Sequence, residues 1–340
     1  MRSANLVTRS ALAAASIACT LSYASSSRAA DGPLVAFAQE GIYNSWRSAN
    51  NDSILSEAKK NGLNLTWVNA DKDQSRQVAQ VQNLLKLKPK VLIVEPAEQE
   101  AATPIAKLAD DAGVPLIVAD RGLSVPPGNG MFKMQITVDW KQVGTELGKA
   151  AVEYLKNKNG KPAGNIVEIV GTIGSAPQLG MDEGFKSVIS AYPDIKIIAS
   201  QDGNNERGPG LSIMEDFLTA HGAGQIDLVF AQNDEMAIGA LKAIQAAGRN
   251  ELVGGIISKD GQLQAVREVA NGHFAADCTN TPYFGPILMP YVKALLDGKD
   301  VPAAPPKPFV CISSLTPDAQ KEAKELLAEM EKNKMEFAPR

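Results

Sequence analysis

Polar side chains follow most of the short apolar runs in this sequence, where the strands of a parallel sheet would end. They carry carboxylates, amides, guanidinium and ammonium groups at Gln39, Glu40, Glu95, Asp120, Arg121, Gln232, Asn233, Asp234, Lys259 and Asp260. In open parallel sheets, ligands bind beyond the carboxyl ends of the strands, because loops and helix N-termini converge there. Each residue alone also suits a turn or a helix cap, and we expect Asp234 to be an N-cap. Together they predict a polar binding site.

The residue types in this set suit a ligand that carries several hydroxyl groups. Each hydroxyl can donate a hydrogen bond to a carboxylate and accept one from a guanidinium or an amide. An aromatic ring can cover the C–H surface of such a ligand, and Trp46 beside Arg47 could supply that ring. The alternative for Trp46 is a core position at the start of a helix.

Catalytic motifs are poorly supported. Glu95 and Asp120 could imitate the acid and base of a glycoside hydrolase, but the sequence does not fix their separation. The chain lacks the G-x-S-x-G, G-x-x-x-x-G-K-[ST] and G-x-G-x-x-G patterns. Its histidines, His221 and His273, do not stand at metal-ligand spacing from a cysteine pair. We therefore expect a binding protein, not an enzyme, with no metal and no cofactor.

The elements that would position these residues alternate between strand-like and helix-like segments. Apolar runs of strand length occur at Leu34–Ala38, Leu65–Val68, Val91–Val94, Leu116–Ala119, Ile166–Val170, Ile195–Ala199, Leu228–Ala231 and Leu252–Ser258. Runs that are apolar throughout are typical of parallel strands buried on both faces. Between them lie helical patterns such as Val78, Val81, Leu84 and Leu85. This βαβα alternation, repeated twice, predicts an α/β fold of two doubly wound parallel-sheet lobes.

The boundary between the lobes is expected near Val138 and Asp139. There the strand-like Met134–Val138 gives way to a helical pattern over Trp140–Leu155. No Pro- or Ser-rich linker separates them, so strands should join the lobes. The predicted N-terminal lobe is 30–138 plus 281–312, and the C-terminal lobe is 139–280 plus 313–340. A proline-rich extended stretch and then a helix over Pro317–Lys334 are expected late in the chain.

Length and charge restrict the class of protein further. The chain has 340 residues, which favours two domains, and a net charge of −4. Lysines and arginines are scattered along the sequence, so a nucleic-acid partner is not expected.

The first thirty residues have the layout of an export signal. Arg2 and Arg9 precede the apolar run Ala11–Leu21, and small residues follow. The run is shorter than the roughly 20 residues that span a bilayer, so cleavage after Ala29 is predicted, with residues 1–29 as the signal peptide. A lipid anchor on Cys19 is disfavoured, because Ser16 stands where a bulky aliphatic residue would be needed. The mature protein should therefore be periplasmic.

Export would leave two cysteines, Cys278 and Cys311, in the mature chain. Both lie near the ends of apolar runs, where neighbouring strands could meet, and an oxidising compartment permits a disulfide between them. The alternative is two buried thiols that act as small hydrophobic residues.

Three segments resemble one known family. The stretch VFAQNDEMAIGALKAIQAAG at Val229–Gly248 and the stretch GVPLIVADR at Gly113–Arg121 are similar to the ribose type of periplasmic sugar-binding proteins. The segment NSWRSANND at Asn44–Asp52 looks most like the galactofuranose-binding branch. The resemblance implies a type I periplasmic binding protein-like fold with a three-strand hinge. It also implies a monomer that delivers a sugar to the membrane permease of an ABC transporter.

The family's binding positions fall on residues of both predicted lobes. Together with the strand-end residues, they give the predicted ligand-binding set: Gln39, Glu40, Trp46, Arg47, Glu95, Asp120, Arg121, Gln178, Asp182, Asn205, Asn233, Asp260 and Asn280. Some positions depart from the family pattern. Gln178 and Asp182 stand where many relatives have an arginine, Glu95 replaces a neutral amide, and Lys259 is unusual before the aspartate. The ligand is therefore not expected to be ribose, and a furanose such as galactofuranose or a related polyol is expected.

The implied mechanism is a clamp in which two lobes close around one ligand. Contacts from both lobes favour the closed state only by their differential affinity for it. Three alternatives share parts of this pattern. A sensor for chemotaxis or signalling would use the same clamp, a sugar hydrolase would need two carboxylates at hydrolytic spacing, and a repressor would need an N-terminal helix-turn-helix.

Overall fold

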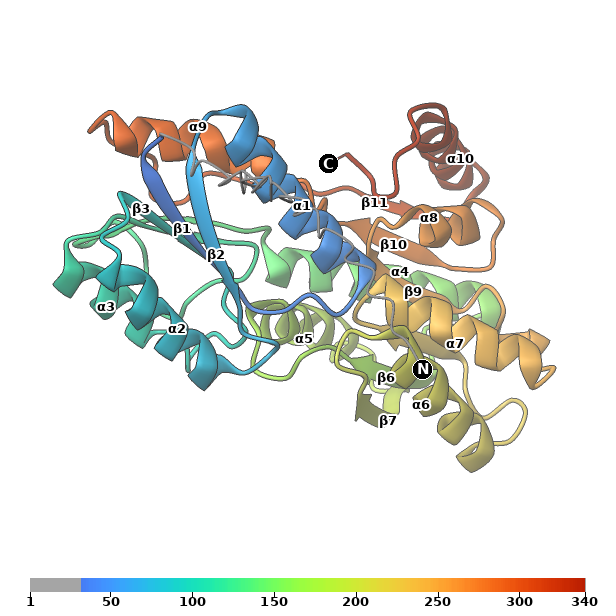
Figure 1. The fold of residues 1–340 in the computed structure, drawn as a ribbon. Coiled ribbons are helices and arrows are strands. Elements are labelled where there is room, and N and C mark those ends of the chain that lie inside the picture. Colours follow the sequence, from blue (N-terminus) through green and yellow to red (C-terminus); the bar gives the residue numbers. More distant parts are fainter. Residues whose placement is uncertain (1–31, 340) are drawn as a thin grey trace, which may run out of the picture.

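The strands of this protein form two separate, mainly parallel sheets (Figure 1). The computed structural model describes residues 32–339, so the predicted signal peptide at 1–29 lies outside the described residues. The first sheet has the order β2-β1-β3-β4-β5. Its strands are β1 (Leu34–Gln39), β2 (Asn64–Asn69), β3 (Val91–Val94), β4 (Leu116–Ala119) and β5 (Phe132–Ile136). All of its pairings are parallel.

The second sheet repeats this winding and adds one antiparallel strand. Its order is β11-β10-β9-β8-β6-β7. The strands are β6 (Gly164–Val170), β7 (Ile195–Asp202), β8 (Leu228–Ala231), β9 (Ile256–Asp260), β10 (Ala276–Thr279) and β11 (Cys311–Ser313). Only the β10–β11 pairing is antiparallel among the described strands. In each sheet the chain moves first to one side and then to the other, so each has a switch point where ligands bind in such folds.

Helices cover both faces of the first sheet because its strands are apolar on both faces. Val35 and Phe37 of β1 belong to one core cluster, and the intervening Ala36 and Ala38 belong to the other. The first cluster is covered by α1 (Ser45–Lys60) and α9 (Phe284–Leu296), which lie side by side although they are far apart in the sequence (Figure 1). The second is covered by α2 (Gln74–Lys86) and α3 (Pro104–Ala112).

The second sheet is layered in the same way. One face packs against α4 (Trp140–Asn159) and α5 (Ala176–Ile189). The other packs against α6 (Arg207–Ala220), α7 (Asp234–Ala246), α8 (Leu263–Ala270) and α10 (Pro317–Lys332). A Cβ atom on Gly184 would collide with the backbone of Lys141, so this glycine permits the close contact between α4 and α5. The predicted fold of two parallel α/β lobes is confirmed.

Several predicted boundaries were wrong by a few residues. The run Leu252–Ser258 is not one strand, because Asn250–Leu252 forms a short 3-10 turn and β9 starts only at Ile256. Gly254, at a φ of 92°, breaks the extended conformation between them. The strand placed at Met134–Val138 is β5, which lies two residues earlier, and the last helix ends at Lys332.

Three stretches of chain pass between the sheets: 137–139, 280–283 and 297–310. The division of the chain into the two predicted lobes stays a prediction, and the contacts depart from it in two places. Cys311 and Ile312 already belong to β11 of the second sheet. Phe337, near the C-terminus, belongs to the core cluster of the first sheet.

The segment after α10 contacts both halves of the molecule. Helix α10 packs against α8 of the second half. The segment that follows α10 makes two backbone hydrogen bonds to the second half. Glu336 O accepts from Leu263 N (2.8 Å), and Ala338 N donates to Gly261 O (2.8 Å). The Phe337 side chain between them is 1% exposed in the cluster that contains Trp46 and Phe284. This segment therefore ties a loop of the second sheet to the core of the first.

Among the described helices, none combines the length and apolarity that crossing a bilayer requires.

We predict that Phe337→Ala lowers the free energy of unfolding by about 3–5 kcal/mol, because it leaves a cavity in a closed core. Urea unfolding followed by tryptophan fluorescence measures the change. Val310→Ala, at a position that is 40% exposed, is the control and should change the midpoint little. Equal shifts for the two variants would show that Phe337 does not anchor the C-terminal segment.

Candidate functional site

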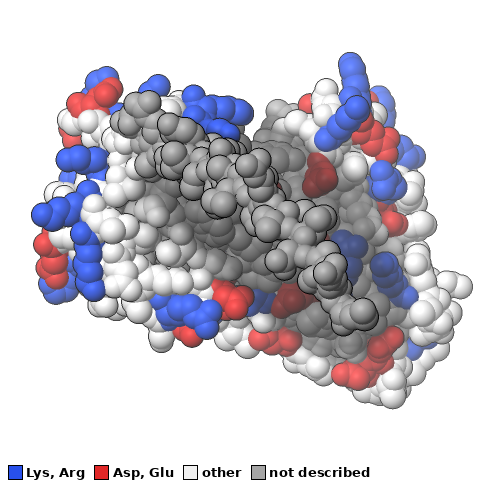
Figure 2. Space-filling view, in the orientation of Figure 1, with Lys and Arg blue, Asp and Glu red and all other residues white. Residues whose placement is uncertain are grey.

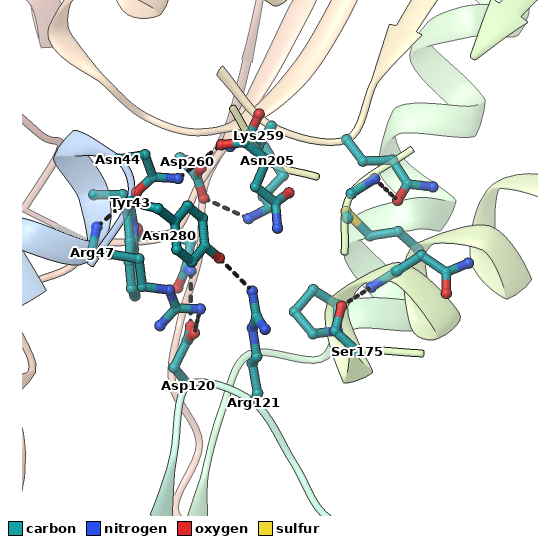
Figure 3. Close-up of a pocket in the computed structure, with 17 residues that line it drawn as sticks. Tyr43, Asn44, Arg47, Asp120, Arg121, Ser175, Asn205, Lys259, Asp260 and Asn280 are labelled. Atoms are coloured by element: carbon teal, nitrogen blue, oxygen red, sulfur yellow. Dashed lines mark hydrogen bonds and ion pairs between the residues drawn. The ribbon is translucent and has the colours of Figure 1, made fainter. Parts of the chain in front are cut away.

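A cavity lies between the carboxyl ends of the two sheets, and side chains from both surround it (Figure 3). Its lining residues are Tyr43, Asn44, Trp46, Arg47, Asp120, Arg121, Gly171, Ser175, Pro177, Gln178, Met181, Asn205, Gln232, Asn233, Lys259, Asp260 and Asn280. Most of them follow β1, β4, β6, β8 or β9, or stand in the first turn of the next helix. The topology therefore gathers residues that are up to 237 positions apart, from Tyr43 to Asn280.

Arg47 is the centre of the first half of the site. Asn44 caps α1 by accepting a hydrogen bond from Arg47 N, which places Arg47 in the first helical turn. Its guanidinium contacts three carboxylates: Nε lies 2.8 Å from Glu40 Oε1, Nη1 lies 3.0 Å from Glu95 Oε2, and Nη2 lies 2.7 Å from Asp120 Oδ2. Burial alone would lower the pKa of Arg47, but Asp120 and Glu40 hold that pKa well above its usual value.

The three carboxylates differ in their surroundings. Burial raises the pKa of Glu95 to about 7, although Arg47 opposes the shift. Burial acts in the same direction on Asp120, but the charges of Arg47 and Arg121 outweigh it and lower the Asp120 pKa. Glu95 also accepts from Asn50 Nδ2 (3.0 Å). Asp120 therefore stays ionised in the cavity wall.

A second chain of contacts runs through Arg121 and Tyr43. Arg121 Nη2 donates to the Tyr43 hydroxyl (3.0 Å), which donates to Glu40 Oε1 (2.8 Å). Arg121 Nη1 donates to Ala97 O (3.0 Å). These bonds hold the guanidinium of Arg121 against the cavity.

Residues of the strand crossings take part in the site. Asn280 Nδ2 donates to Asp120 Oδ1 (3.2 Å), and Lys307 Nζ donates to Asn280 Oδ1 (2.5 Å). Trp46 Nε1 donates to Asn280 O (2.6 Å). Trp46 is 4% exposed and belongs to the first core, yet it also lines the cavity, so both interpretations of this residue apply.

In the second half, helix α7 presents amides to the cavity. Asn233 is the N-cap of α7, with its Oδ1 accepting from Met236 N (3.0 Å) and its Nδ2 donating to Asn205 O (3.3 Å). The prediction that Asp234 is this cap was wrong, because the helix begins one residue earlier. Asp234 is buried instead and accepts from Ser258 Oγ and Gln262 N, each at 2.7 Å.

The structure brings nine of the predicted binding residues to the cavity wall and leaves four behind it. At the wall are Trp46, Arg47, Asp120, Arg121, Gln178, Asn205, Asn233, Asp260 and Asn280; behind it are Gln39, Glu40, Glu95 and Asp182. The first three of these four surround Arg47 and Asn50. Asp182 accepts from Gln178 Nε2 (3.1 Å) and Gln232 Nε2 (2.6 Å). Contact of any of these residues with a ligand stays a prediction.

Eight further residues of the wall lie outside the predicted ligand-binding set: Tyr43, Asn44, Gly171, Ser175, Pro177, Met181, Gln232 and Lys259. Gln232 and Lys259 are among the strand-end residues that the sequence indicated, whereas the other six were missed. Ser175 caps α5 and Pro177 stands in its first turn, a helix-start signal that places both near the carboxyl end of β6. Nothing in the sequence pattern indicated Tyr43 or Met181.

Direct contacts join the two halves around the cavity. Asn44 Nδ2 donates to Asn205 O (2.9 Å), Ser45 Oγ donates to Glu235 Oε1 (2.5 Å), and Gln99 N donates to Gly174 O (2.9 Å). Lys72 forms an ion pair with Glu206. The two halves are therefore in contact in this structure, in a closed arrangement.

Two further features concern the rest of the molecule. A disulfide joins Cys278 and Cys311, which are register partners on β10 and β11. On the described part of the face in Figure 2, acidic and basic side chains are interspersed.

Two α/β lobes that enclose one polar cavity define a class of ligand-binding proteins, and comparison with known proteins places the chain within it. Residues 35–300 match the family model described as "Periplasmic binding protein domain". The chain belongs to this family, and its type I periplasmic binding protein-like fold is confirmed. It is a binding protein, as the lack of catalytic motifs indicated.

Three relatives show the extent of the similarity. The galactofuranose-binding protein YtfQ of Escherichia coli K12 is 33% identical over 326 residues, covering 94% of this chain and 97% of YtfQ. The ribose import binding protein RbsB of the same strain is 32% identical over 231 residues, covering 68% of this chain and 73% of RbsB. A Mycobacterium smegmatis protein in complex with β-D-fucofuranose has a TM-score of 0.78 at 30% identity, covering 89% of this chain and 96% of that one.

Glu95 should make stability depend on pH, and Glu95→Gln tests this. The pKa of Glu95 is raised from 4.5 to about 7, so the folded protein holds this proton more tightly than the unfolded chain. Its contribution to the free energy of unfolding is therefore fully present below pH 4.5 and is lost as pH rises to about 7, by up to about 3 kcal/mol. Chemical unfolding at pH 5 and pH 8 should show a smaller loss for Glu95→Gln than for the wild type. A surface variant, Glu183→Gln, should keep the wild-type loss; an unchanged loss in Glu95→Gln would contradict the prediction.

Proposed function

We propose that this protein is the periplasmic solute-binding component of an ABC transporter and that it binds a monosaccharide, in its furanose form, between its two lobes. Its transport partner would be a membrane permease that recognises the closed, ligand-bound form. The predicted signal peptide would deliver the chain to the periplasm. The single observation that carries the proposal is the cavity itself, to which both lobes contribute buried charged and amide groups.

The chemistry of the cavity supports a sugar as the ligand. The first lobe offers the carboxylate of Asp120 and the guanidinium of Arg121. The second offers Asn233 and Asp260. Alternating donors and acceptors match vicinal hydroxyl groups, each of which donates one hydrogen bond and accepts others. The Trp46 and Tyr43 rings add apolar surface for the C–H face of the ligand.

The furanose form is supported by the start of α1 and by the relatives. YtfQ is named for galactofuranose, and the M. smegmatis structure holds β-D-fucofuranose. Here Arg47 is fixed by three carboxylates, Glu40, Glu95 and Asp120. A third carboxylate gives every guanidinium nitrogen of Arg47 an ionic partner, so its position in the wall is rigid.

The clamp mechanism follows from contacts that only the closed form can make. A ligand held by groups of both lobes adds to the direct bonds from Asn44 to Asn205 and from Ser45 to Glu235. Those bonds are lost when the lobes separate, so the ligand shifts the equilibrium toward closure by its differential affinity. Asn280, in the crossing stretch 280–283 and bonded to Asp120, links the site to the hinge.

The hydrolase alternative is contradicted by the geometry. Glu95 and Asp120 both bind Arg47, and Glu95 lies behind the cavity wall. A general acid and base must both reach the scissile bond, which Glu95 cannot do from this position.

A thermal-shift screen tests the proposal. A sugar at 100 times its dissociation constant should stabilise the protein by about 2.7 kcal/mol. We expect D-galactose or L-arabinose to raise the melting temperature, and methyl furanosides to do so at lower concentrations than methyl pyranosides. No shift with any aldose, furanoside or polyol would contradict the proposal.

Asp120→Asn should weaken binding of the sugar found in that screen by at least about 10-fold, because it removes a buried acceptor that is ionised. Isothermal titration calorimetry measures the dissociation constant. Asp297→Asn, at a side chain that is 60% exposed, is the matched control and should bind like the wild type. Equal affinities of the two variants would remove Asp120 from the site.

A further inference from the structure

Each lobe ends a strand with an adjacent cation and carboxylate. Asp120 and Arg121 follow β4, and Lys259 and Asp260 end β9. All four line the cavity. Both aspartates have positive φ angles, 57° at Asp120 and 144° at Asp260. Such angles are strained for residues other than glycine and persist where the surrounding structure imposes them, commonly at ligand sites. The two pairs are therefore counterparts, one on each side of the cavity.

Lys259 is buried but keeps donor capacity for a ligand. It is 8% exposed, and its Nζ lies 2.6 Å from Asp260 Oδ1 and 5.2 Å from the centroid of the Trp140 ring. An ammonium group has three N–H donors. Within residues 32–339, Asp260 is the hydrogen-bond acceptor of this group, so two donors have no protein acceptor there.

The first lobe shows the same combination. Arg121 uses both terminal nitrogens on Tyr43 and Ala97, but its Nε is buried without a hydrogen-bond partner among the described residues. The neighbouring Asp120 supplies the carboxylate. A buried donor without a partner is costly, so this N–H is available to a ligand oxygen that reaches Arg121.

Lys259 is the cation next to a group of buried carboxylates. Asp234, Asp260 and Asp277 are all buried at this end of the second sheet, and Lys259 Nζ lies 2.6 Å from Asp260 Oδ1. A further buried negative charge here would be costly, so this wall favours a neutral ligand.

We propose that Lys259 is a specificity-determining residue of this receptor, one that binds a vicinal diol together with Asp260 while Arg121 and Asp120 bind a second diol on the opposite edge of the sugar. One hydroxyl of the Lys259 diol accepts from Nζ, and its neighbour donates to Asp260. The ligand is then a neutral sugar with free adjacent hydroxyls toward both lobes. The inference rests on the proposed function, because it requires that a sugar occupies this cavity.

The test combines one substitution in the protein with one missing hydroxyl in the sugar and compares the four binding affinities. Calorimetry compares the wild type and Lys259→Met with D-galactose, L-arabinose and their monodeoxy derivatives. Lys259→Met keeps the length of the side chain and removes its donors, so it should weaken binding of the parent sugar about 10- to 100-fold. For at least one deoxy derivative, the wild type should bind the derivative more weakly than the parent sugar. Lys259→Met should bind that derivative and the parent sugar with equal affinity.

Controls separate the role of Lys259 from its effect on folding. Lys149→Met removes an equal charge at a side chain that is 60% exposed and should leave affinity unchanged. Lys259→Gln keeps an N–H donor, so it should lose less affinity than Lys259→Met. If thermal unfolding shows that Lys259→Met does not fold, Lys259→Gln is used in its place.

Affinity of Lys259→Met within twofold of the wild type would overturn the inference and leave the proposed function intact. Equal losses of affinity in the two proteins for every deoxy derivative would overturn it as well. If the wild type binds none of these sugars, the proposed function fails first, and the role of Lys259 fails with it.

Discussion

One buried guanidinium organises the first half of the binding site. Arg47 contacts Glu40, Glu95 and Asp120, which stand at the ends of β1, β3 and β4. Three carboxylates this close together would repel one another strongly in a buried environment. A planar guanidinium can bind all three because each nitrogen donates in a different direction. The first turn of α1 thus fixes the edge of the sheet, and the polar wall of the cavity depends on it.

The second half of the site relies on amide groups and is joined to the first half through the strand crossings. Amides at Asn233 and Asn44 both donate to the backbone carbonyl of Asn205, so neutral groups of the two lobes meet when the cavity is closed. The charged pair at Lys259 and Asp260 lies beside them. Asn280 lies in the crossing stretch 280–283 and donates a hydrogen bond to Asp120, so the crossing and the site are in direct contact. In the proposed function, a single set of polar groups would serve both ligand binding and lobe closure.

The positions at strand ends predicted which residues lie near the site better than they predicted which of them line the cavity. Glu40, Glu95 and Gln39 do end strands, yet they are not part of the wall. Glu40 and Glu95 bind the guanidinium of Arg47, and Gln39 donates to Asn50. The N-cap of α7 was predicted one residue late, since Asn and Asp are both good caps and stand next to each other. Nothing in the sequence pattern indicated that Lys307 lies near the site. It lies in a proline-rich stretch, and only the path of that stretch past Asn280 brings it to the site.

The sequence by itself determined the alternation of strands and helices, and with it the two parallel sheets, because apolar runs of strand length admit few other arrangements. It also determined that polar groups would meet at the strand ends. Only the tertiary structure decided which of them face the cavity and which neutralise one another behind it. That choice depends on side-chain direction and on contacts between residues more than a hundred positions apart, such as Asp120 with Asn280. It also decided that Phe337 closes the core of the first lobe, since an apolar residue near a chain terminus carries no local signal of the partner it will find.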